Sequence, residues 1–168
     1  MCSKKTYILI VLLSIIVILS GCGGNARPAE RAVENLLSQI ERGNINDISL
    51  TIYYSNPISF TPVRSNVRDL VNRDYEYRLV IDGVHLEEYI DVIKRLGDIE
   101  LIPIERRSSI NARIYYVFER NNRRILDVGM WGEGGSVFVN GVEVERKDIF
   151  IDIIIPFLSE EKASLLGR

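Results

Sequence analysis

The single histidine of the chain, His85, is the first residue to consider for chemistry, because imidazole serves as a metal ligand or a general base near neutral pH. It lies beside Glu87 and Glu88 at the start of an expected helix. Metal sites normally gather several His, Cys or carboxylate ligands, and one histidine supplies no His-based set. We therefore interpret His85 as a residue of the helix's first turn, and we expect neither a metal nor another cofactor.

Neighbouring carboxylates raise the possibility of hydrolase chemistry. The pairs are Glu87/Glu88, Glu143/Glu145 and Glu160/Glu161. Glycosidase-type catalysis needs two carboxyl groups that face each other across a substrate, and an ordinary charged surface gives the same sequence pattern. No Gly-x-Ser-x-Gly elbow favours a serine nucleophile beside His85. A carboxylate-based hydrolase therefore remains a remote alternative to a protein that is not an enzyme.

The glycine-rich run from Gly129 to Gly135 has some resemblance to a phosphate-binding loop. Such a loop leads from a strand into a helix and usually carries a lysine. Here the run connects two expected strands and carries Glu133. We interpret it as a hairpin loop.

Aromatic side chains on expected strands are the least ordinary feature of the sequence. They are Tyr53, Tyr54, Tyr75, Tyr77, Tyr115, Tyr116 and Trp131. Adjacent tyrosines in a strand point to opposite faces, so one of each pair is expected outside the core. Exposed Tyr and Trp are favoured at protein interfaces and on sugar-binding platforms. The candidate binding surface is Tyr53, Tyr75, Tyr77, Tyr115 and Trp131, and the competing interpretation is that tyrosine is simply a good strand residue.

Arginines flank the expected strand that carries Tyr115 and Tyr116. They are Arg106, Arg107, Arg120, Arg123 and Arg124. Together they form either a small basic rim or, as the simpler interpretation, solvated turn charges.

The N-terminal stretch indicates where the protein lies. Lys4 and Lys5 precede an apolar run from 7 to 19, and Leu19-Ser20-Gly21-Cys22 follows. A basic segment, an apolar segment and a small-residue cleavage site are typical of an export signal. The apolar run is shorter than the roughly 20 residues that a spanning helix needs. A cleaved secretory signal with an accidental cysteine is the competing interpretation.

The segment ending at Cys22 resembles the lipobox of bacterial lipoproteins. The resemblance implies cleavage before Cys22 and lipid attached to that residue, with 1–21 as the signal peptide, 22–27 as a lipidated tether and 28–168 as one domain. Two acyl chains give a stable membrane anchor where one is marginal. We therefore expect the protein on the extracytoplasmic face of the cell membrane.

Charge and cysteine content exclude several functions for the mature domain. Without Lys4 and Lys5 the 21 basic residues fall to 19 against 23 acidic ones, so the formal charge is about −4 and predicts no nucleic-acid partner. The two cysteines are Cys2, in the signal, and Cys22. The domain therefore has no thiol chemistry and no disulfide.

Hydrophobic periodicity predicts the elements in order. A helix starts at Pro28 and stops at Gly43, and a strand covers 48–54. A short helix capped by Ser65 covers 65–72, a strand covers 75–81 with a turn at Asp82-Gly83, and a second helix carries Leu86, Ile90, Ile93 and Leu96.

A strand-rich second half follows. An antiparallel meander is expected over 100–145, with strands at 101–104, at the sheet edge because of Pro103, and at 112–119, 124–131, 136–139 and 142–144. The strands at 136–139 and 142–144 are joined by Asn140-Gly141. For the apolar block 148–158 helix and strand compete, and helix is favoured because Asp148 and Asp152 share one stripe. A last short turn begins at Ser159.

The sequence therefore predicts one α+β domain: an antiparallel sheet of about five to seven strands with two to four helices mainly on one face. The final third of the chain contains Val137-Phe138-Val139-Asn140-Gly141, Asp148-Ile149-Phe150 and Ile155-Pro156-Phe157-Leu158. Together with the signal, this part of the chain resembles small lipoproteins of Gram-positive bacteria whose domain has no assigned function. We expect a non-catalytic protein-interaction module of the cell envelope, with the membrane and another envelope protein as partners. A domain that binds a small ligand or cell-wall glycan is the alternative, and the sequence does not indicate the oligomeric state.

Overall fold

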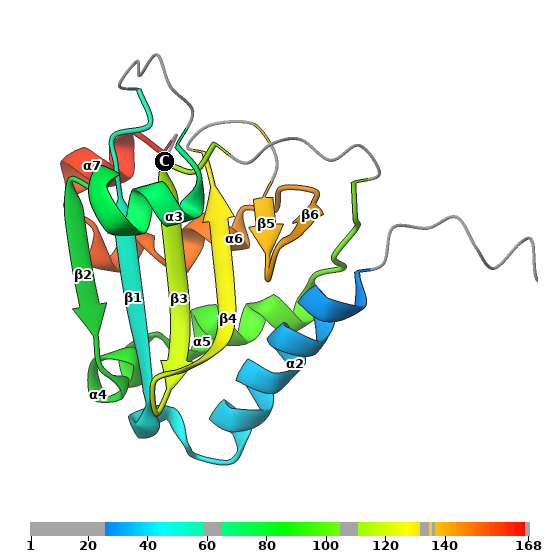
Figure 1. The fold of residues 1–168 in the computed structure, drawn as a ribbon. Coiled ribbons are helices and arrows are strands. Elements are labelled where there is room, and N and C mark those ends of the chain that lie inside the picture. Colours follow the sequence, from blue (N-terminus) through cyan, green and yellow to red (C-terminus); the bar gives the residue numbers. More distant parts are fainter. Residues whose placement is uncertain (1–25, 59–64, 105–110, 132–134, 136, 167–168) are drawn as a thin grey trace, which may run out of the picture.

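A single antiparallel sheet organises the domain (Figure 1). The computed structural model describes residues 26–58, 65–104, 111–131, 135 and 137–166, so the expected signal peptide and Cys22 lie outside the described residues. Within the described residues the sheet has six strands in the order β2-β1-β3-β4-β5-β6. The strands are β1 (Ile48–Tyr54), β2 (Tyr77–Ile81), β3 (Ile114–Arg120), β4 (Arg123–Met130), β5 (Val137–Val139) and β6 (Val142–Val144).

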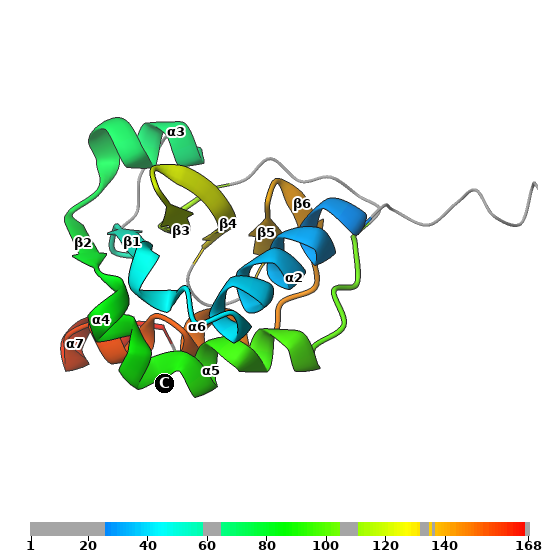
Figure 2. The ribbon, with the colours of Figure 1, turned by 90° about the horizontal axis from the view of Figure 1, so that it is seen from below.

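Most of the helical segments pack on one face of the sheet. Figure 2 shows α2, α4 and α5 on one side of the strands and α3 on the other. The helix-covered face carries α2 (Arg27–Glu41), α4 (Gly83–Leu86), η3 (Glu87–Tyr89), α5 (Ile90–Lys94), η4 (Arg95–Asp98), α6 (Ile149–Asp152), η5 (Ile155–Phe157) and α7 (Glu160–Ser164). A short turn η1 (Ile45–Asp47) joins α2 to β1. The predicted α+β class is confirmed.

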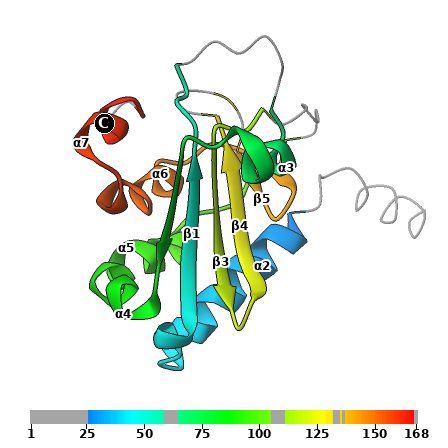
Figure 3. The same cartoon turned by 60° about the vertical axis from the view of Figure 1, so that its left-hand side comes forward.

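The other face of the sheet is called the open face below. Among the described residues it is covered by α3 (Val67–Asp69) and the single π turn η2 (Leu70–Asp74). Figure 3 shows α3 on one side of the strands and α4, α5 and α7 on the other.

Helix α2 follows from its sequence. Pro28 lies in the first turn, where its missing N–H costs nothing. Ala29, Val33, Leu36 and Ile40 recur at helical spacing, and all four are buried against the core. Gly43 adopts a positive φ of 75° and its N–H donates to Ile40 O at 2.9 Å, which ends the helix as predicted.

The main core lies between the sheet and these helices. The period-two pattern places alternate strand residues there: Leu50, Ile52 and Tyr54 from β1, Tyr116 and Phe118 from β3, and Leu126 and Val128 from β4, all buried. The neighbours of Tyr54 and Tyr116, namely Tyr53 and Tyr115, lie in the second, smaller cluster on the open face. The prediction that adjacent tyrosines divide between the two faces is confirmed.

Two helix boundaries differ from the predictions. The helix expected to be capped by Ser65 is capped by Asn66, whose extended backbone lets its Oδ1 accept from Asp69 N at 3.0 Å. Ser65 instead donates from Oγ to Asp74 Oδ2 at 2.6 Å. Asp82-Gly83, expected as a turn, starts α4, because Asp82 caps it.

Other segments are shorter or more interrupted than expected. The second helix is divided into α4, η3, α5 and η4, and β2 begins at Tyr77 rather than Tyr75. The segment 101–104 lies beside β6 through a single bridge, Pro103 to Val144. For 148–158 the favoured helix is correct, with α6 followed by η5 at Pro156.

Candidate functional site

One transverse row of side chains crosses the open face. Pairwise register places Arg78 beside Tyr53, Tyr53 beside Tyr115, Tyr115 beside Gly129, Gly129 beside Phe138 and Phe138 beside Glu143. Directly opposed residues on one face of a sheet are close neighbours. The row therefore has a gap at Gly129, where no side chain separates Tyr115 from Phe138.

Three of the predicted surface tyrosines lie together towards the β2 end of this row. The ring centroid of Tyr53 lies 5.6 Å from that of Tyr75, edge-on, and 6.0 Å from that of Tyr115. Arg78 covers the Tyr53 ring, with its Cζ 5.6 Å from the centroid. Tyr75 is 40% exposed but Tyr115 only 7%, because α3 and η2 bring Leu70 against it. The tyrosines therefore combine a structural role under α3 with an exposed margin.

The far side of Tyr115 borders a groove that we call the Gly129 groove. It has a volume of about 480 Å³. The described residues lining it are Val67, Tyr115, Arg124, Asp127, Gly129, Phe138, Asn140 and Gly141. Its walls are thus aromatic, its floor is a glycine of β4, and one end is polar.

The polar end is a linked set of three side chains. Asp127 Oδ2 lies 2.6 Å from Arg124 Nη1, and Arg124 also donates to the hydroxyl of Tyr115. Burial raises the pKa of Asp127, and the positive charge of Arg124 acts in the opposite direction. Burial, followed by the negative charge of Asp127, raises the pKa of Tyr115, so its phenol stays protonated at neutral pH.

The β5–β6 turn fixes the remaining polar wall. Asn140 adopts a positive φ of 46° and, with Gly141, makes the expected two-residue hairpin. Its Oδ1 accepts from Asp127 N at 2.8 Å, and its own N–H donates to Asp127 O at 2.9 Å. This arrangement suits binding, since it offers aromatic faces and a fixed set of polar groups.

The other two predicted surface residues lie elsewhere. Tyr77 faces the helix-covered side, where Lys162 Nζ of α7 lies 4.9 Å from its ring centroid. Trp131, half-buried after β4, lies against the buried Arg113, whose Cζ is 5.3 Å from its ring centroid. The structure therefore groups Tyr53, Tyr75 and Tyr115, of which only Tyr115 lines the groove, and places Tyr77 and Trp131 elsewhere.

Sequence reasoning missed Phe138 and Asp127 as lining residues and treated Gly129 only as part of a hairpin loop. The Asn140-Gly141 turn signal predicts the β5–β6 pairing correctly. The pairing of β3 with β4 and of β4 with β5 decides which residues share a row, and the alternation pattern alone does not give it.

The candidate catalytic groups come from several elements. His85 is exposed at the start of α4, and the three carboxylate pairs lie on η3, at β6 and on α7. No group of three His, Cys, Asp or Glu side chains able to hold a metal occurs in the part of the chain that the structure describes. Arg106 and Arg107 of the expected basic rim lie outside the described residues.

Comparisons with known proteins give no relative from which to transfer a function. No protein-family model, curated protein or solved structure matches this chain. Among the described helices, none has both the length and the apolar character that a bilayer crossing requires.

Proposed function

We propose that this protein is a lipoprotein anchored through Cys22 on the extracytoplasmic face of the bacterial membrane, and that its domain is a non-catalytic protein-interaction module of the cell envelope. The observation that carries the binding role is the Gly129 groove, where Tyr115 and Phe138 flank a glycine floor beside an Arg124–Asp127 pair. The three carboxylate pairs lie on three different elements, η3, β6 and α7, so the described elements offer no specific support for a carboxylate-based hydrolase.

A protein partner is favoured by exposed apolar side chains at the β2 end of the sheet and after β1. Tyr75 and Val80 are 40% and 49% exposed near β2, and Ile58, after β1, is 70% exposed. Aromatic residues are enriched at the core of protein interfaces, and exposed apolar patches mark such sites. Tyr75, through its contact with Tyr53, and Val80, through the register of β2 with β1, lie on the same open face as the groove.

Site-specific photo-cross-linking on intact cells tests the proposal. A photoreactive phenylalanine analogue at Phe138 is expected to give a discrete adduct that disappears in the Gly129→Val background, because the pleat directs the new side chain into the groove. The matched control carries the analogue at Val84, which is exposed on α4. Identical adducts from both positions, or an adduct that survives Gly129→Val in a protein with unchanged circular dichroism, would contradict the proposal.

A small-ligand or cell-wall-glycan binding domain is the second candidate. It is favoured by the groove's volume of about 480 Å³, within the range of ligand pockets, and by the polar groups of Asp127 and Asn140 beside aromatic walls. This candidate predicts that a cell-wall sugar or peptide fragment raises the melting temperature of the wild type and not of Gly129→Val. No shift across such fragments would leave the protein-interaction module as the better account.

A further inference from the structure

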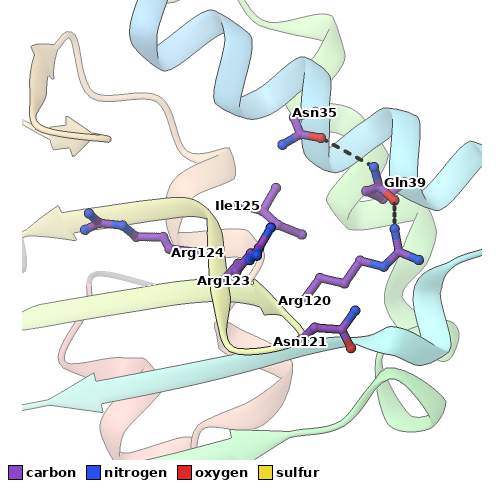
Figure 4. A pocket seen from close by; sticks show the side chains of 7 residues that line it. All are labelled: Asn35, Gln39, Arg120, Asn121, Arg123, Arg124 and Ile125. Carbon is purple, nitrogen blue, oxygen red and sulfur yellow. Dashed lines mark hydrogen bonds between the residues drawn. The ribbon is translucent and has the colours of Figure 1, made fainter.

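A second groove lies on the opposite side of the sheet, between α2 and the β3–β4 turn (Figure 4). We call it the arginine groove. It has a volume of about 570 Å³, and its lining residues include Asn35 and Gln39 of α2, and Arg120, Arg123 and Ile125 of the hairpin. No carboxylate occurs among the described residues that line it.

The turn brings two positive charges together. Asn121 and Asn122 both have positive φ, 51° and 59°, which closes a two-residue hairpin and pairs Arg120 directly with Arg123. Like charges directly opposite on a sheet repel each other. Asp47 balances Arg120, with Oδ2 2.9 Å from Nη2, whereas Arg123 has no carboxylate partner among the described residues.

The hydrogen-bonding capacity of the groove is biased towards donors. Gln39 Oε1 already accepts from Arg120 Nη1 at 2.6 Å and from Asn44 Nδ2 at 3.0 Å. Asn35 Oδ1 accepts from Gln39 Nε2 at 3.4 Å. Both amide oxygens are thus occupied, while Asn35 Nδ2 and the Arg123 guanidinium make no hydrogen bond within the described part of the chain.

We propose that the arginine groove binds a phosphate group, with Arg123 as its charged ligand and the amide of Asn35 as a further donor. A phosphate carries about −1.5 to −2 charges and three strong acceptor oxygens, which matches a site with surplus donors and an uncompensated cation. Arg recognises phosphate through two parallel hydrogen bonds. Free phosphate and the headgroup of an anionic lipid are the two sources of this chemistry. Arg124 lines both grooves, but neither of the two proposed ligands, Arg123 and Asn35, lines the Gly129 groove.

Nuclear magnetic resonance on the full-length chain in a neutral detergent tests the proposal. Sodium phosphate is titrated against sodium chloride at equal ionic strength, and short-chain phosphatidylglycerol is titrated in a second arm. We expect saturable shifts of the Asn35 and Gln39 side-chain amides and of the Arg123 Nε–H in at least one arm. The arm that saturates at the lower concentration identifies the source.

Variants that remove the same charge at different places distinguish phosphate binding in the arginine groove from a general effect of the protein's net charge. Arg123→Gln should weaken binding about tenfold, as expected for the loss of a charge-assisted hydrogen bond, and Arg123→Lys should weaken it less. Arg68→Gln removes the same charge from α3 on the open face and should leave the affinity unchanged. Absence of saturable shifts in both arms, or equal weakening by Arg123→Gln and Arg68→Gln with unchanged backbone spectra, would overturn the proposal.

Discussion

Asp82 and His85 form a local pair at the start of α4. Asp82 Oδ1 accepts from the backbone N–H of His85 at 3.0 Å and lies 2.7 Å from His85 Nδ1. The side-chain hydrogen bond raises the pKa of His85 above its ordinary value of 6.5 and lowers the pKa of Asp82 below 3.8. His85 therefore has a local role at the beginning of a helix, as its sequence context predicts.

This pair gives the first prediction, which concerns pH. Stabilisation by protonated His85 is fully present below pH 6.5 and is lost as the pH rises through the raised pKa of His85. Stabilisation by ionised Asp82 is present above pH 3.8 and is lost as the pH falls through the lowered pKa of Asp82. The pair is therefore expected to stabilise the folded domain fully between pH 3.8 and pH 6.5. Its contribution decreases outside this interval, as the pH passes the lowered pKa of Asp82 or the raised pKa of His85.

Proton resonances of the single imidazole measure this directly. The titration midpoint of His85 should lie above 6.5 in the wild type and fall towards 6.5 in Asp82→Asn. Asp91→Asn, which removes an exposed acid from α5, is the control and should leave the midpoint unchanged. An equal midpoint in wild type and Asp82→Asn would show that Asp82 does not perturb His85.

For single residues, the sequence predicts which face of the sheet a side chain occupies more reliably than it predicts which residues surround that side chain. Strand alternation correctly separates Tyr53 from Tyr54 and Tyr115 from Tyr116, because orientation within a strand is a local property. The neighbourhood of Tyr115 depends on Gly129 and Phe138, which come from other strands. Only the pairing register brings them together.

At the scale of elements, α4 approaches η1 so closely that one residue admits no side chain. A Cβ on Gly83 would collide with the backbone of Ile45 and Asn46. The same contact positions Asp82 and His85 at the beginning of α4. A glycine that the sequence offers only as a turn former is therefore a packing residue.

Gly83→Ala is expected to destabilise the domain by about 2–3 kcal/mol, because backbone atoms cannot move aside as a flexible side chain can. Gly97→Ala is the matched control: its new Cβ would lie 2.9 Å from Leu37 Cδ1, the far end of a flexible side chain, and should cost less than about 1 kcal/mol. Urea unfolding followed by the fluorescence of Trp131 gives both values. Equal midpoints for the two variants would contradict the collision.

The sequence predicts whether a segment is a helix or a strand more reliably than it predicts where a helix is interrupted. The period-two runs of β1 and β6 give their bounds as observed, and the 3.6-residue period gives α2. The break of the second helix at Tyr89, whose φ is −116°, leaves its apolar periodicity intact and is invisible to a pattern argument. Tertiary packing, which includes the 4.7 Å contact between the rings of Tyr89 and Phe157, accompanies that break.

At the scale of the whole molecule, the proposed location rests on one residue. Cys22→Ala should move the protein from the membrane fraction to the soluble fraction, because a domain with a net formal charge of about −4 has no net positive charge to hold it on an anionic membrane in place of two acyl chains. Cys2→Ala, in the expected signal peptide, is the matched control and should remain with the membrane. Fractionation of cells with salt-washed membranes distinguishes the two.

A Cys22→Ala protein that stays in salt-washed membranes would refute the lipoprotein proposal and leave the groove's binding chemistry to be tested alone. Release of both variants would indicate that the cysteines act through something other than lipid attachment.

The strand order has a consequence for how the chain reaches its native state. Strands β3 to β6 are neighbours both in the sequence and in the sheet, so each pairing closes only a short loop. The pairing of β1 with β3 joins residues that are far apart in the sequence, since Tyr54 pairs with Ile114 and Ile48 with Arg120. Contacts between nearby residues form before distant ones, because loop closure costs entropy. We expect the C-terminal meander to nucleate folding and the N-terminal helix and β1 to dock late. The N-terminal helix and β1, which are synthesised before the other described elements, would then be the last to become ordered.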